Sequence, residues 1–136
     1  MGDLRGDFLG QVVYAQGTCQ PGFGLKVFPE RSSIYVSVPN IPAPVLREIA
    51  RFADVHLYGE EGDILYATPN LLGIHTISGG KRTFHLPEKV DVIYDLFADQ
   101  LVAKNTHMFE VSLRPASTAL FYAGEEDLIL SMKPVK

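Results

Sequence analysis

Hydrophobic and polar residues alternate along most of the chain, with the two-residue period of a half-buried β-strand. Met108–Leu113 is the clearest case, since a polar residue separates Phe109 from Val111. Gly, Pro, Asn and Asp residues lie between such segments and mark turns. Together these signals predict strands at Gln11–Ala15, Phe23–Phe28, Ser33–Val38, Val55–Tyr58, Asp63–Ala67, Leu71–Thr76, Lys81–Leu86, Val90–Phe97, Gln100–Lys104, Met108–Leu113 and Thr118–Tyr122.

One segment has the helical period instead. The predicted helix runs from about residue 44 to residue 53, with Pro44 at the first position, where its missing N–H is not needed. Its apolar stripe consists of Val45, Leu46, Ile49, Ala50 and Ala53. A helix of about ten residues is marginal in isolation. We therefore expect it to dock on a neighbouring domain or subunit after the stiff, proline-rich link Pro39–Pro44, with packing contributed by Leu46, Ile49 and Phe52.

Short strands at near-regular spacing are typical of a sandwich or barrel. The predicted fold class is mainly β: a sandwich of short, mostly antiparallel strands with one short helix. Residues 1–53 are predicted to form N-terminal strands, the link and the helix, at a junction with an upstream domain. Residues 54–136 are predicted to form the β-sandwich domain, with one compact unit as the alternative. The tail Glu125–Lys136 is expected to be a further edge strand or partly disordered.

Length and charge exclude several functional classes. The chain has 136 residues, enough to bury a core without disulfides or metal ions. Its net charge of −4, without a basic block, argues against a nucleic-acid partner. No apolar run approaches the about 18 residues of a membrane span, and the first residues lack the layout of a signal peptide. Cys19 is the only cysteine, so no internal disulfide forms. Localisation is not indicated.

Acidic and histidine side chains form no recognisable catalytic or metal-binding pattern. Hydrolysis of a glycoside needs two carboxyl groups that face one cleft, whereas the acids here fall mostly in turns or on outward positions. The histidines lack the spacing of a compact zinc motif, although His56 and His75 would approach each other if their strands paired. We assign no catalytic residue, metal ligand or cofactor. The residues considered are Glu60, Glu61, Asp63, Asp91, Asp95, Asp99, Glu125, Glu126, Asp127, His56, His75, His85 and His107.

Carbohydrate is the one ligand with candidate residues. Sugar rings stack on exposed aromatic side chains, and the chain has six Tyr and eight Phe but no Trp. Phe84, Phe109 and Phe121 occupy predicted core positions. The weak candidates for sugar contact are Tyr14, Tyr35, Tyr58 and Tyr66, each of which also suits a core or junction position.

Several stretches resemble the C-terminal part of large bacterial glycoside hydrolases. They are IYVSVPNIP (34–42), VLREIARFADVHLY (45–58), DILYA (63–67), NLLGIHT (70–76), GKRTFHL (80–86), VIYDLF (92–97), FEVSL (109–113) and STALFY (117–122). Some of those enzymes have a catalytic barrel, then an amidotransferase-like α/β domain, then a terminal β-domain. The resemblance implies that residues 1 to about 53 are the end of the middle domain or its junction with the terminal one. It places the catalytic carboxylates in the barrel, so none is transferred to this sequence.

Three functional hypotheses follow. The leading one is a non-catalytic, structural accessory domain of a glycoside hydrolase, whose partners are the upstream domains of that enzyme or a second copy of the chain. The second is an independent carbohydrate-binding module, which requires several coplanar exposed tyrosines. The third is a small stand-alone enzyme, which requires a pocket that gathers His56, His75 and an acid.

Overall fold

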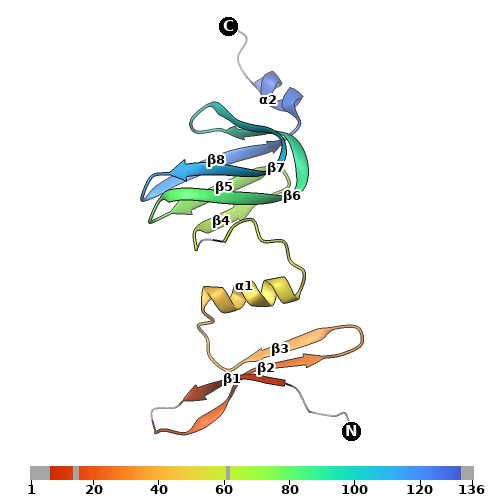
Figure 1. Ribbon diagram of the computed structural model, residues 1–136, viewed down its shortest axis with the longest axis vertical. Coiled ribbons are helices and arrows are strands. Elements are labelled where there is room, and N and C mark those ends of the chain that lie inside the picture. The colour runs from red at the N-terminus through yellow and green to blue at the C-terminus, as the bar shows by residue number, and fades with distance from the viewer. Residues whose placement is uncertain (1–6, 14–15, 61, 133–136) are drawn as a thin grey trace. The chain divides into compact units, whose positions relative to one another are not determined.

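The computed structural model describes residues 7–13, 16–60 and 62–132 and confirms a mainly β, antiparallel fold (Figure 1). The chain divides into two compact units, residues 1–49 and 50–136. One three-stranded sheet lies in the first unit and one five-stranded sheet in the second. The division falls inside the predicted helix, and the boundary at residues 53 and 54 remains a prediction.

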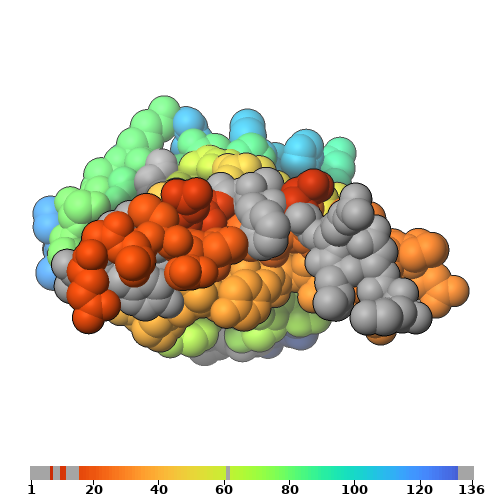
Figure 2. Space-filling view, turned by 90° about the horizontal axis from the view of Figure 1, so that it is seen from below, coloured from red at the N-terminus to blue at the C-terminus, as the bar shows by residue number. Residues whose placement is uncertain are grey.

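The N-terminal sheet has the order β1-β2-β3. Pro21, predicted to lie in a turn, is instead inside β2 and pairs with Gln11 next to an irregularity of the β1–β2 ladder. Such an irregularity tolerates a residue that has no N–H to donate. Parts of this N-terminal sheet lie at the surface (red to orange in Figure 2), and Tyr35 of β3 is exposed. The strands are β1 (Asp7–Val13), β2 (Cys19–Val27) and β3 (Ser32–Val36).

The predicted helix is confirmed as α1 (Ala43–Phe52). The helix ends at Phe52, and Asp54 just beyond it has a φ of 54°, outside the right-handed helical region. No residue of α1 is buried, and Leu46 and Phe52 are 49% and 53% exposed. The packing of these two side chains on a partner remains a prediction.

The strand predicted at Val55–Tyr58 is absent. The segment instead makes isolated contacts with one residue of the neighbouring strand. Tyr58 O accepts from His85 N at 2.8 Å, and His56 Nε2 donates to His85 O at 2.8 Å. Because a histidine side chain takes the place of a backbone N–H, the pairing does not extend into a ladder.

The second sheet has the order β4-β5-β8-β6-β7. Each of the two long strands β6 and β7 was predicted as a pair of shorter ones. The β6–β7 register shifts between His85 and Val90 around Pro87, so the predicted gap in β6 is a bend inside a continuous strand. The strands are β4 (Ile64–Ala67), β5 (Leu71–Thr76), β6 (Gly80–Asp95), β7 (Gln100–Leu113) and β8 (Ser117–Gly124).

The bend gives this unit its two layers (Figure 1). The first half of β6 pairs only with the end of β7, whereas the second half pairs with both β7 and β8. The ring of Phe109 joins the layers, with centroids 5.4 Å from Phe84 and 5.1 Å from Phe121. The predicted core positions of these rings are thus confirmed. The core comprises Leu72, Ile74, Phe84, Leu86, Ile93, Phe109, Ala119, Phe121 and Ala123.

The described part of the tail is a helix, α2 (Glu126–Met132), and not the edge strand or disordered segment that was predicted. Glu126 and Asp127 occupy its first turn, where acidic side chains favour a helix N-terminus. Ile129 is buried against Tyr94 and Tyr122, on the sheet surface opposite the core. Neither helix of the described residues has the length and apolar character needed to cross a bilayer.

Candidate functional site

The candidate tyrosines come from different parts of the chain. Tyr14 lies outside the described residues, and Tyr35 belongs to the N-terminal sheet, where it is 64% exposed. Tyr66 is 75% exposed on β4, opposite Gly73 of β5. Tyr58 is half-buried and packs against the core. Tyr35 and Tyr66 are thus exposed in different units, and the use of the tyrosines in sugar binding stays a prediction.

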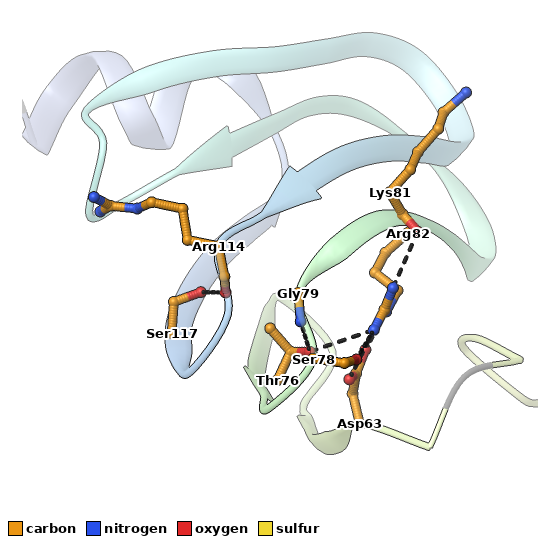
Figure 3. A network of polar contacts seen from close by, with 8 residues as sticks. All are labelled: Asp63, Thr76, Ser78, Gly79, Lys81, Arg82, Arg114 and Ser117. Atoms are coloured by element: carbon orange, nitrogen blue, oxygen red, sulfur yellow. Dashed lines mark hydrogen bonds and ion pairs between the residues drawn. The ribbon is translucent and has the colours of Figure 1, made fainter.

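A network of polar contacts surrounds Arg82 at the start of β6 (Figure 3). Arg82 Nε donates to Asp63 Oδ2 at 2.6 Å, and Nη2 donates to Ser78 Oγ at 2.9 Å. Longer contacts join Nη2 to Asp63 Oδ1 and to Thr76 Oγ1, both at 3.4 Å. Thr76 Oγ1 also accepts from the Gly79 amide at 3.1 Å. The network thus connects the loop before β4 with the β5–β6 turn.

The contacts of this network stabilise the local fold. The hydrogen bond from Arg82 holds the pKa of Asp63 below its usual value of 3.8, so the carboxylate is ionised at neutral pH. An acid or base in catalysis works best with a pKa near the working pH. The shift of Asp63 is in the opposite direction, and its carboxylate already accepts from a cation of the same unit.

His56 and His75 form hydrogen bonds with different strands. His75 Nδ1 contacts Thr118 Oγ1 at 2.9 Å on the neighbouring strand β8, whereas His56 bonds to the His85 carbonyl. A pocket of about 350 Å³ that His75 lines includes Asp63 and Arg82 but not His56. This pocket therefore brings His75 together with an acid but without His56, and the hypothesis of a stand-alone enzyme stays a prediction. Across residues 7–13, 16–60 and 62–132, no three His, Cys, Asp or Glu side chains could hold a metal ion.

Several other acids have structural contacts. Asp95 Oδ1 accepts from the amides of Phe97 and Ala98, both at 2.9 Å, and so closes the β6–β7 turn. Asp99 Oδ1 accepts from the Tyr94 hydroxyl at 2.5 Å. Glu126 forms an ion pair with Lys104. These contacts explain the acids as parts of turns and helix ends.

A cavity of about 600 Å³ opens at the bend of β6. The β4–β5 turn borders it on one side and the irregular segment of β6 on the other, with core residues at its base. Sequence reasoning missed it because it joins segments far apart in the chain, and only Tyr58 among its residues was a candidate. The signals available were Pro69-Asn70 at a turn and Pro87 within a strand. Its lining comprises Tyr58, Ala67, Thr68, Pro69, Asn70, Leu71, Leu72, Leu86, Pro87, Glu88, Lys89, Val90 and Ala123.

Two sites with different chemistry are thus present in the C-terminal unit. The Asp63–Arg82 network satisfies its charges internally, whereas the cavity has polar and apolar groups facing open space. No family model matches the chain, and no curated protein or solved structure is significantly similar to it.

Proposed function

We propose that this chain is a non-catalytic accessory domain of a glycoside hydrolase and packs through α1 on the upstream domains of that enzyme. The observation that carries the proposal is that the apolar side of α1 is only partly buried, with no residue of the helix fully buried. Leu46 and Phe52 each lie three residues from Ile49 on the helix, and both are about half exposed.

The energetics favour a partner for this stripe. Full burial of a leucine or phenylalanine side chain contributes about 1.5–3 kcal/mol relative to exposure. A ten-residue helix is marginal in water without such burial. The prolines of residues 39–44 restrict the preceding backbone, which would limit the orientations in which α1 meets a partner.

The resemblance of the sequence to the C-terminal part of glycoside hydrolases supplies the class of partner. The structural contacts of Asp63, Asp95 and Asp99 support a non-catalytic role, because these carboxylates bond within their own unit. An accessory domain of this kind would place its upstream partner against α1 and leave the chemistry to the barrel.

Association through α1 is the direct test. The genomic region that encodes the chain should also encode a glycoside hydrolase barrel, and the purified barrel protein should bind the chain in calorimetric titration. Leu46→Glu, on the stripe, should weaken this binding at least tenfold, whereas Glu48→Gln on the same helix should change it less than twofold. Equal effects of the two variants would contradict docking through the stripe.

Hydrolysis provides the second test. The full chain should release no nitrophenol from a panel of nitrophenyl glycosides above the buffer blank. Turnover that increases with chain concentration would overturn the non-catalytic assignment. An independent carbohydrate-binding module would instead bind sugars without any association that depends on α1.

A further inference from the structure

The cavity at the β6 bend is built from segments that other contacts fix in place. In the β4–β5 turn, Thr68 N donates to Leu71 O at 2.9 Å and Leu71 N donates to Thr68 Oγ1 at 3.0 Å. Asn70 is tied to β8, because its carbonyl accepts from Ala123 N at 2.9 Å and its Nδ2 donates to Ala123 O at 3.2 Å. One wall is therefore rigid before any ligand arrives, which lowers the entropic cost of binding.

The opposite wall is the irregular part of β6. Between His85 and Val90 the β6–β7 register shifts, so residues 86–89 leave the regular ladder, and Pro87 has no N–H to offer. Irregularities of this kind redirect side chains and are frequent beside binding sites. Here they bring two consecutive charged side chains, Glu88 and Lys89, to the cavity.

Polar groups of the cavity have capacity to bind a ligand. Within the described part of the chain, no residue hydrogen-bonds the Tyr58 hydroxyl, Asn70 Oδ1, the Glu88 carboxylate or the Lys89 ammonium. Carboxylate and amide oxygens accept hydrogen bonds, an ammonium donates them, and a phenol does both. Their neighbours at the base are apolar side chains of the core, Leu72 and Leu86.

These features select a neutral, polyhydroxylated ligand. The charges of Glu88 and Lys89 cancel, so the cavity has no net charge to attract an anion or a cation. Glu88 and Lys89 are exposed, and a purely apolar ligand would form no hydrogen bonds with them. A sugar ring has hydroxyls that both donate and accept at its edge and C–H groups on its faces. The volume of about 600 Å³ lies within the range of small-molecule sites, about 300–1,000 Å³.

We propose that this cavity binds a neutral sugar ring, with Asn70, Glu88 and Lys89 holding its hydroxyls and the half-buried Tyr58 contacting one of its faces. The choice of a sugar over other neutral polyols rests on the proposed function, in which the parent enzyme acts on a glycan. The accessory domain would then hold a sugar unit of the glycan in addition to docking through α1.

The test is a titration of the full chain with D-glucose, D-galactose, D-xylose, cellobiose and lactose, followed by ¹H–¹⁵N correlation spectra. We expect saturable shifts with at least one sugar, located at the amides of Leu72, Leu86, Val90 and Ala123. Glu88→Ala should weaken that binding at least tenfold. Tyr66→Ala removes a candidate tyrosine that is 75% exposed and lies outside the cavity, and it should change binding less than twofold.

Three results would overturn the site. They are the absence of saturable shifts with every sugar, shifts centred on Tyr66 and His75, and equal binding by the parent chain and Glu88→Ala. Because both variants and the parent are judged from the same spectra, loss of fold is seen directly as loss of dispersion. If the chain binds its partner through α1 but binds no sugar, the cavity proposal alone is rejected. If it binds sugar but does not associate through α1, the docking proposal alone is rejected.

Discussion

The Asp63 carboxylate and the Arg82 guanidinium meet at 2.6 Å, although each side chain is only 9% exposed. The two residues lie 19 positions apart and come from the loop before β4 and from β6. A buried pair of this kind contributes little relative to an apolar pair, but the loss of one partner leaves a buried charge unpaired. The contact therefore makes the local fold sensitive to either residue.

Removal of the Asp63 charge should destabilise the chain strongly. We expect Asp63→Asn to lower the free energy of unfolding by about 3–5 kcal/mol, because the guanidinium of Arg82 stays buried without its counter-charge. Urea unfolding followed by far-UV circular dichroism measures the change. Glu110→Gln is the matched control, since that carboxylate pairs with Lys81 at the surface and its loss should cost far less. Similar losses in the two variants would contradict the buried-pair interpretation.

From the Asp63–Arg82 pair we also predict that the stability of the fold decreases at acid pH. The hydrogen bond from Arg82 lowers the pKa of Asp63 in the folded chain, so the unfolded chain takes up the proton first as the pH falls. The stabilisation is therefore complete above the unfolded pKa of about 3.9 and is lost as the pH falls through the folded pKa. Urea unfolding at about pH 6 and about pH 3 should show a larger decrease for the parent chain than for Asp63→Asn. Equal decreases would show that Asp63 does not contribute to this acid sensitivity.

The local signals in the sequence were sufficient for β5 and α1, which lie where alternation and helical spacing placed them. They failed for β6, because a proline normally ends a strand and only the pairing with β7 shows that the strand continues through Pro87. The tail was misread because a seven-residue helix has too few turns for a clear period. The Asp63–Arg82 network and the cavity depend on contacts between distant segments, which no local pattern contains.

Gly79 should resist substitution. Its φ of +64° is a conformation that residues with a side chain rarely adopt, and an added Cβ would lie 2.5 Å from the backbone nitrogen of Pro115. We expect Gly79→Ala to destabilise the chain by about 1–3 kcal/mol or more, since backbone must move. Gly62→Ala is the control, because an added Cβ there meets no atom within 4 Å and φ is not positive. Thermal unfolding of the two variants measures the difference, and equal midpoints would refute the steric argument.

Truncation of a core residue should lower the stability of the free chain. Truncation of an exposed residue of α1 should instead weaken association with a partner. Ile74 is 1% exposed, so Ile74→Ala should cost about 2–5 kcal/mol in the free energy of unfolding. Leu46 is 49% exposed in the chain by itself, so Leu46→Ala should cost less than about 1 kcal/mol there. Urea unfolding of the free chain tests both values. If a partner covers the stripe, Leu46→Ala should weaken binding to that partner by more than tenfold while leaving the free chain almost unchanged. A large loss of stability in the free chain would instead mean that Leu46 packs within the chain, and α1 would no longer support docking.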